Sequence, residues 1–307
     1  MDLRMAIGDS HTIRVMGRIL FLALAAAVQA AAAPPPDTEI FLAPLSTGSG
    51  ALVGAPLNIT NSPGYDNQPS FTPDGTGILF TSIRGGGTQT DIYRYDIASA
   101  GTARVTNTPE SEYSPTVTPD AAHISVVRVE ADGTQRLWRF TLDGRTPEIV
   151  LTNVKPVGYH VWADDHTLAL FVLGSPASLQ IADTGTGAAD VLARGINRSI
   201  QRMPNGAISF VARSAAGPEA TLSIRELDPK TKRIAPLVDA VAGAREADCA
   251  WTPDGMLVMV EKDVLYGWRK GEREWRKLAD LAALGLHGVT RIAIGPKGDR
   301  IAFVTQP

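Results

Sequence analysis

The sequence predicts an all-β fold, a six-bladed β-propeller, and three observations lead to it. The first is a tight turn, Thr72-Pro-Asp-Gly75, which is followed by an apolar strand at 77–83. Pro73 presets φ for the first corner, Asp74 can bond its own backbone, and Gly75 tolerates a positive φ. The second observation is that this turn recurs, and the third is that the chain closes on itself.

The turn returns five more times in recognisable form. Measured at the position of Asp74, the copies stand at 74, 120, 165, 205, 254 and 297, so the steps are 46, 45, 40, 49 and 43 residues. A period of about 45 residues with one hairpin in every unit is typical of a propeller blade. A β-sandwich would not repeat one turn at near-constant spacing, and a β-helix would need a shorter period.

Each unit is expected to hold four strands, which alternate apolar and polar residues between turns rich in Gly and Pro. The five complete units are predicted at 68–72, 77–83, 90–97 and 103–106; 114–118, 123–129, 135–142 and 147–151; 158–162, 167–173, 178–183 and 189–193; 199–203, 207–212, 221–228 and 233–238; and 247–251, 256–261, 264–270 and 275–280.

The sixth unit is divided between the two ends of the chain. Strands at 289–295 and 299–305 supply its inner half, while 39–42 and 56–60 have the pattern of the outer two strands. We therefore expect the N-terminal strands to complete the last blade. This 2+2 closure leaves no open sheet edge in the ring.

The N-terminal 30 residues resemble a secretory signal peptide. Arg14 and Arg18 precede an apolar run at 19–28, and Val28-Gln-Ala30 fits the small-residue rule for cleavage. The apolar run is shorter than the ~20 residues that span a bilayer. We expect cleavage after Ala30, an Ala- and Pro-rich lead-in at 31–36 and the propeller at 37–307, with Met16 as an alternative start.

Composition limits the partner and the compartment. The net charge is −3 and charged residues make up 20%, so no basic surface for nucleic acid is indicated. Cys249 is the only cysteine, which excludes an internal disulfide and leaves no lipid-attachment cysteine after the signal. We expect a monomer that is periplasmic or secreted, with no membrane span once the signal is removed.

The repeat resembles that of TolB-type propellers. The resemblance rests on Leu57-Asn-Ile-Thr-Asn-Ser-Pro-Gly64, Pro69-Ser-Phe-Thr-Pro-Asp-Gly75 and Asp91-Ile-Tyr-Arg-Tyr-Asp96, and it weakens in the third and fourth units, where Arg202 replaces an apolar residue. It implies an exported six-bladed propeller. TolB also carries an N-terminal α/β domain, for which we expect no counterpart here, so a role in the Tol–Pal system does not follow.

No catalytic or metal motif stands out in the sequence. It contains no G-x-S-x-G nucleophile elbow, no H-E-x-x-H, no paired cysteines and no glycine-rich phosphate loop. We therefore expect no cofactor, no catalytic residue and no metal site, although four acids near one opening leave calcium binding open.

The candidate site is the mouth of the central channel, just ahead of each turn, where the units differ most. Convergent polar groups in a concavity indicate a binding site. The same residues could also be solvated loops and inter-blade hydrogen bonds. The ligand-binding candidates are Asp66, Gln68, Glu112, Tyr113, Tyr159, His160, Arg198, Glu246, Asp248 and Arg291.

These observations favour an exported, non-enzymatic propeller that binds a protein or peptide partner in the bacterial cell envelope. A small carbohydrate, or a small ligand that bears an anion, is the alternative occupant. The alternative function is a propeller enzyme of the glycoside hydrolase or lyase type, or a carbohydrate-binding module, acting at the funnel. An enzyme would need two titratable groups held close together in a deep pocket.

Overall fold

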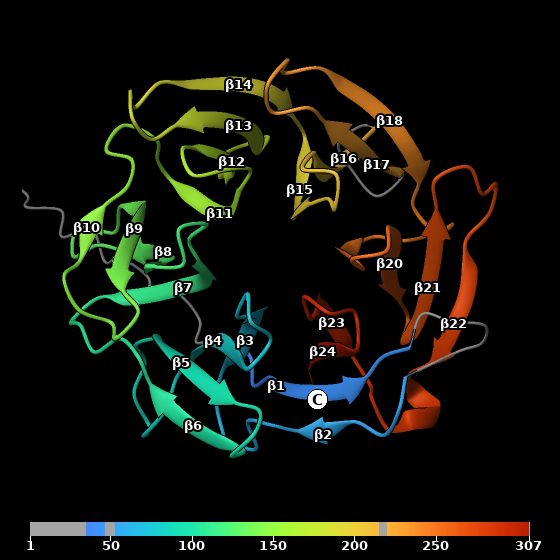
Figure 1. Ribbon diagram of the computed structural model, residues 1–307, viewed down its shortest axis with the longest axis horizontal. Helices are drawn as coiled ribbons and strands as arrows, with labels where there is room; N and C mark the ends of the chain where they lie inside the picture. The colour runs from blue at the N-terminus through green and yellow to red at the C-terminus, as the bar shows by residue number, and fades with distance from the viewer. Residues whose placement is uncertain (1–34, 47–52, 215–219, 307) are drawn as a thin grey trace, which may run out of the picture. The chain divides into compact units, whose positions relative to one another are not determined.

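The computed structural model describes residues 35–46, 53–214 and 220–306, and these residues form six four-stranded antiparallel sheets. The sheets are arranged as blades around a central channel (Figure 1). The predicted all-β, six-bladed propeller is confirmed. The predicted signal peptide lies outside the described residues.

Five blades are each built from four strands that follow one another in the chain, the first strand lying innermost (Figure 1). Their strands are β3 (Asp66–Phe71), β4 (Gly77–Ser82), β5 (Asp91–Asp96), β6 (Gly101–Arg104); β7 (Ser111–Val117), β8 (His123–Val129), β9 (Gln135–Thr141), β10 (Glu148–Ile149); β11 (Val157–Trp162), β12 (Thr167–Val172), β13 (Ser178–Asp183), β14 (Ala189–Arg194); β15 (Ile196–Arg202), β16 (Ile208–Arg213), β17 (Leu222–Leu227), β18 (Ile234–Asp239); and β19 (Asp248–Trp251), β20 (Met256–Glu261), β21 (Val264–Arg269), β22 (Arg276–Asp280).

The sixth blade combines the two ends of the described chain, in the strand order β2-β1-β24-β23. It contains β1 (Glu39–Pro44), β2 (Leu57–Asn58), β23 (Val289–Ile294) and β24 (Arg300–Thr305), with a short 3-10 helix, Ala282–Leu284, ahead of β23. Strands β1 and β24 pair along six residues, with Phe41 opposite Phe303. The predicted 2+2 closure is therefore confirmed.

The hydrophobic core is divided among the junctions between blades. Six buried clusters occur in the described residues, and each combines side chains of two neighbouring blades. At the closing junction, for example, Ile40 and Val304 of the sixth blade pack with Ile78 and Phe80 of the first. Because apolar burial stabilises every junction, each blade is fixed to both of its neighbours, and the inner strands are held in position around the channel.

The recurring turn is a structural device. In the first copy the Thr72 hydroxyl donates to Asp74 Oδ1 at 2.6 Å, and the same carboxylate accepts from the Thr76 amide at 3.0 Å. These hydrogen bonds lower the pKa of Asp74 to about 2. In the worn third copy, Asp164 accepts from the amides of His166 and Thr167 instead. The turn therefore survives loss of its proline.

No helix in the described part of the chain is long and apolar enough to cross a membrane.

Candidate functional site

The central channel encloses a cavity of about 340 Å³, lined by the innermost strand of every blade: β3, β7, β11, β15, β19 and β23. We call it the channel cavity. Six of the ten candidates predicted from sequence line it: Gln68, Tyr159, His160, Arg198, Asp248 and Arg291. The other four, Asp66, Glu112, Tyr113 and Glu246, do not.

Irregular backbone turns several of these side chains toward the channel. Register shifts interrupt the pairing of β3, β7, β11, β15 and β23 with the next strand out. At two of these bulges, Gln68 and Ser114 adopt φ values of 58° and 53°. A bulge adds a residue to one strand and redirects its side chains. Consecutive residues such as Asn67 and Gln68 can therefore both contribute at the channel.

Hydrogen bonds across the channel wall join neighbouring blades. Gln68 Oε1 accepts from the Ser114 amide at 2.8 Å, and Asp248 Oδ2 accepts from the Ile292 amide at 2.8 Å. Arg291 Nε donates to Asn67 Oδ1 at 3.1 Å, which joins the last blade to the first. Burial raises the pKa of Asp248, although Arg291 and Arg198 act against this. Some of the predicted site residues therefore form hydrogen bonds that join neighbouring blades.

Arginine and tyrosine side chains interact at the channel. Arg291 Nη2 donates to Tyr159 Oη at 3.2 Å, and its guanidinium lies 5.2 Å from the centre of that ring. Burial raises the pKa of Tyr65. Of its charged and polar neighbours, Arg291 and Arg198 lower this pKa, while Tyr159 and Tyr113 raise it. Burial would likewise raise the pKa of Tyr159, but Arg291 and Arg198 lower it.

The channel cavity is cationic. Its lining includes Arg198, Arg202 and Arg291 but one carboxylate, Asp248. Within the described residues, none of these three arginines forms an ion pair. This charge balance differs from the acid-rich opening expected from the sequence.

His160 is buried in the wall of the channel, where it has a structural role. Its Nε2 lies 2.8 Å from the Ser125 hydroxyl, which also accepts from Trp162 Nε1 at 2.9 Å. Burial lowers the pKa of His160 to about 3. The ring is therefore neutral at physiological pH and bridges two blades.

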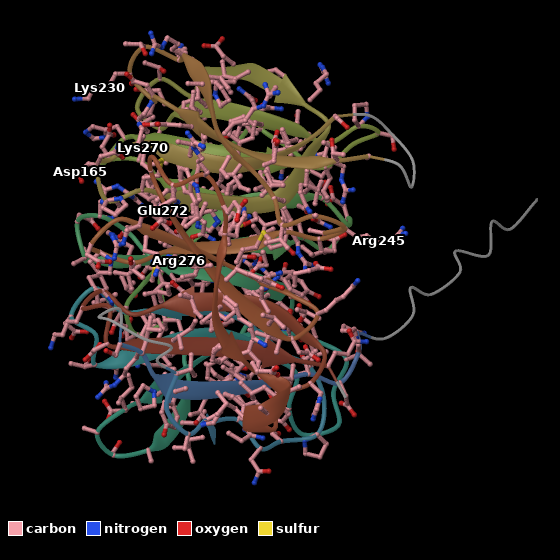
Figure 2. The ribbon with its side chains drawn as sticks, turned by 90° about the vertical axis from the view of Figure 1, so that its right-hand side faces the viewer. Asp165, Lys230, Arg245, Lys270, Glu272 and Arg276 are labelled. Carbon is pink, nitrogen blue, oxygen red and sulfur yellow. The ribbon has the colours of Figure 1, made fainter. Side chains whose placement is uncertain are left out.

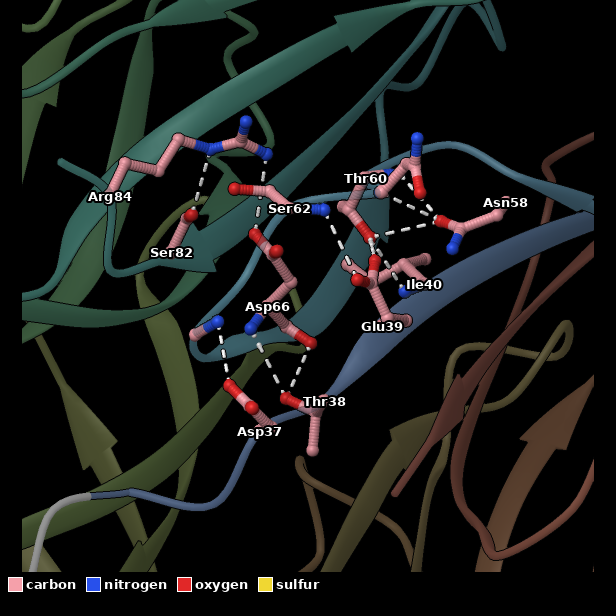
Figure 3. Close-up of polar contacts among 12 residues, drawn as sticks. Asp37, Thr38, Glu39, Ile40, Asn58, Thr60, Ser62, Asp66, Ser82 and Arg84 are labelled. Atoms are coloured by element: carbon pink, nitrogen blue, oxygen red, sulfur yellow. Dashed lines mark hydrogen bonds and ion pairs between the residues drawn. The ribbon is translucent and has the colours of Figure 1, made fainter. Parts of the chain in front are cut away.

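Asp66 belongs to the closing junction rather than to the channel (Figure 3). Its carboxylate is fully buried and pairs with Arg84 at 3.4 Å, and its backbone amide and carbonyl both bond the Thr38 hydroxyl. Burial raises its pKa to about 6, partly offset by Ser82 and Arg84. The expected placement at the opening is wrong because this side chain is fully buried beside Arg84 and does not line the channel cavity.

Glu112 holds the equivalent place in the second blade. It is fully buried, accepts from the Thr106 hydroxyl at 3.1 Å and from the Thr108 hydroxyl, and lies 3.5 Å from Arg128 Nε. Burial raises its pKa to about 7. It too faces away from the channel. Tyr113 is half-buried against the neighbouring blade core.

Glu246 stays on the exposed rim. It accepts from Asn197 Nδ2 at 3.2 Å and lies 3.5 Å from Arg213. The four acids therefore do not surround one opening: one lies in the channel, one on the rim and two inside blade junctions. In the described residues no group of three or more His, Cys, Asp or Glu side chains could hold a metal ion.

Three residues near the channel were missed in the sequence. Tyr65 directly precedes the predicted segment and lies within electrostatic range of Tyr113 and Tyr159, but it stands at a different position of the repeat, so the comparison of units gave no signal for it. Asn67 orients Arg291. Arg202 lines the channel cavity where other units carry an apolar residue, and that departure was visible in the sequence.

No protein-family model matches the chain. A stretch of 45 residues, 15% of this chain, is 51% identical to the Tol-Pal system protein TolB of Bordetella pertussis and spans 10% of that protein. The similarity to curated relatives thus covers about a tenth of their length.

Solved structures show the likeness across most of the chain. A structure from Agrobacterium tumefaciens assigned to TolB superposes with a TM-score of 0.67 and 17% identity, over 88% of this chain and 98% of that one. The fold is that of a TolB-like six-bladed propeller. TolB from Acinetobacter baumannii gives a TM-score of 0.55 and 13% identity, over 88% of this chain and 64% of that chain.

The same fold also occurs in enzymes. An oligogalacturonate lyase in complex with manganese superposes with a TM-score of 0.54 and 14% identity, over 82% of this chain and 80% of the other. At these identities the likeness concerns the fold alone.

Proposed function

We propose that this TolB-like propeller is exported to the bacterial cell envelope and there binds a protein or peptide partner at its channel, without catalysing a reaction. The observation that carries the proposal is the channel cavity itself. Arginine and tyrosine side chains converge in it, and its arginines lack ion pairs among the described residues. Convergent polar groups in a concavity are the usual mark of a binding site.

The size of the channel cavity indicates how such a partner is engaged. About 340 Å³ lies at the lower end of the ~300–1,000 Å³ typical of small-molecule sites. It admits a few side chains rather than a folded element. The partner therefore inserts a short segment into the channel, and the loops around the mouth supply the remaining contacts.

The location in the envelope is supported by the signal-like pattern of residues 1–30 and by the likeness to TolB. The cleaved form would be periplasmic or secreted, and we propose that it acts as a monomer.

The test uses the full chain, affinity-tagged, as bait in periplasmic extract. The matched variant is Gln201→Trp, because Gln201 is a half-buried residue that lines the channel cavity and its side chain makes no hydrogen bond in the described structure. A larger ring there fills the space without removing a bond. We expect wild type to capture a partner that Q201W captures at least tenfold less. No specific partner, or equal capture by both proteins, would contradict the proposal.

The enzyme alternative is favoured by one observation, the fold shared with an oligogalacturonate lyase, since a cationic channel also suits an acidic sugar. A glycoside hydrolase would need two carboxyl groups facing the bond to be cleaved. Asp248 is the single carboxylate that lines the channel cavity in the described chain. Turnover of oligogalacturonate by wild type, lost in R291Q, would favour the enzyme.

A further inference from the structure

We propose that Arg198 and Arg291, together with Tyr159, form a binding site for one carboxylate, presented by an acidic side chain of the inserted peptide segment. This inference rests on the proposed function and adds the chemistry that the partner must carry.

Arg291 is oriented before any ligand arrives. Its Nε is bonded to Asn67 Oδ1 and its Nη2 to Tyr159 Oη, while the ring of Tyr159 lies against its guanidinium. Its Nη1 makes no hydrogen bond within the described structure. A guanidinium fixed on one side and open on the other loses little side-chain entropy when it binds an anion.

Arg198 lies beside Arg291 although the two come from different blades. Its Nη2 donates to the carbonyl of Thr290 at 3.2 Å, and Thr290 directly precedes Arg291 in β23. Both arginines lie within electrostatic range of the same three groups, Tyr65, Tyr159 and Asp248. Both arginines therefore lie in the same part of the channel cavity.

The protein neutralises the charge at this place only in part. Asp248 is the single carboxylate in the described lining, it faces two arginines, and its Oδ2 accepts from the Ile292 amide. Two cations held together in a partly buried cavity repel each other, so an added anion relieves the repulsion. A carboxylate matches the planar guanidinium in shape and accepts paired hydrogen bonds from it.

The rest of the cavity wall suits a peptide segment. Beside apolar side chains such as Pro69, Val161 and Ile294, the lining contains polar side chains such as Thr116 and Gln201. The apolar side chains can pack against the aliphatic part of a glutamate, and the polar ones can bond the peptide backbone. The same polar groups also suit a sugar, which the trigalacturonate arm of the experiment tests. The net charge of −3 disfavours a highly charged polyanion.

The experiment offers the immobilised full chain two libraries of acetylated pentapeptide amides, randomised except for a central Glu in one and Gln in the other. We expect wild type to retain the Glu library at least tenfold better than the Gln library. Arg198→Gln should abolish this preference, because a charge-assisted hydrogen bond typically changes affinity by about tenfold or more. The matched control is Arg245→Gln.

Arg245 suits this comparison because it projects outward from the β18–β19 connection (Figure 2), so R245Q removes the same charge outside the channel. R245Q should keep the wild-type preference. Equal retention of both libraries by wild type, or an unchanged preference in R198Q with wild-type melting temperature, would overturn the proposal. Trigalacturonate, tested alongside, would overturn it if it bound while the Glu library did not.

The result separates this inference from the proposed function. If wild type and R198Q capture the same envelope partner equally while Q201W does not, the channel binds a partner but not through this carboxylate. If the Glu preference holds and depends on Arg198 but no partner is captured, the site is real and the proposed function fails.

Discussion

Charged side chains on the inner strands fall into two regions that differ in how the charge is balanced. In the first two blades, Asp66 and Glu112 are fully buried, and each is paired with an arginine of its own blade, Arg84 or Arg128. In the channel, Arg198 and Arg291 bond backbone or neutral groups instead. We call the first set the junction pairs and the second the channel arginines.

The difference shows how position in the repeat separates structure from binding. Asp66 precedes Gln68 by only two residues, yet one lies inside a blade junction and the other lines the channel cavity. The two members of a junction pair neutralise each other inside the protein, so removal of one should lower the free energy of unfolding. A channel arginine has no ion-pair partner in the described structure, so its removal should weaken binding of a partner. Three predictions test this comparison.

The largest effect is expected for Arg128→Gln. Arg128 is buried, pairs with Glu110 and Glu112, and lies 4.7 Å from the Trp138 ring centre. Its loss leaves Glu112 buried without a cation, and removal of one partner from a buried pair costs about 3–5 kcal/mol. We expect R128Q to lower the free energy of unfolding by about 3 kcal/mol at pH 8, measured by urea denaturation.

Arg139→Gln is the matched control for this measurement. Arg139 pairs with Glu148 at 2.6 Å on the next strand of the same blade, but both side chains are about half exposed. Exposed pairs contribute about 0–1 kcal/mol. If R128Q costs no more than R139Q, the junction pairs do not have the structural role assigned to them.

A smaller effect, on the pH dependence of stability, is expected from the same pair. Burial raises the pKa of Glu112 from 4.5 to about 7. Between these values the folded protein holds a proton that the unfolded chain has released, so this contribution is fully present below pH 4.5 and is lost as pH rises through 7. For one group the slope approaches about 1.4 kcal/mol per pH unit.

Glu112→Gln removes this titration while keeping a group that can accept from Thr106 and Thr108. Urea midpoints measured from pH 5 to 8 should therefore fall more steeply for wild type than for E112Q. Asp66, whose pKa is raised to about 6, should still contribute to the slope of E112Q. Parallel curves for the two proteins would contradict a raised pKa at Glu112.

The fold could be predicted from the sequence because its signals are local and repeated. Each turn carries its own Pro, Asp or Gly, as in Thr72-Pro-Asp-Gly75. Six copies of the turn, although imperfect, together establish the period of the repeat. Ring closure followed because the half-units at the two ends complement each other. A turn that has lost its proline can still form. In the third unit Asp164 stands where the first unit has Pro73, and its carboxylate holds the turn by accepting from two backbone amides.

The lining of the channel cavity was predicted only in part because bulges have weak sequence signals. Neither Gln68 nor Ser114 is a glycine, yet both take a positive φ, and the pairing shifts beside them. A count of residues along an ideal strand therefore misjudges which side chains reach the channel. That is why the acids were expected at one opening, while Tyr65 and Arg202 were not among the candidates.

The smallest effect is expected for Arg198→Gln on stability, and its size tests the comparison. The variant loses one hydrogen bond to the Thr290 carbonyl but also removes one of the like charges that line the channel cavity, so it relieves any repulsion with Arg291. These contributions oppose each other, so we expect a change within about 1 kcal/mol, in either direction, in the urea experiment that gives a loss of about 3 kcal/mol for R128Q. Added salt should weaken the repulsion and reduce any gain in stability. A loss as large as that of R128Q would place Arg198 among the structural charges, and the distinction between junction pairs and channel arginines would fail.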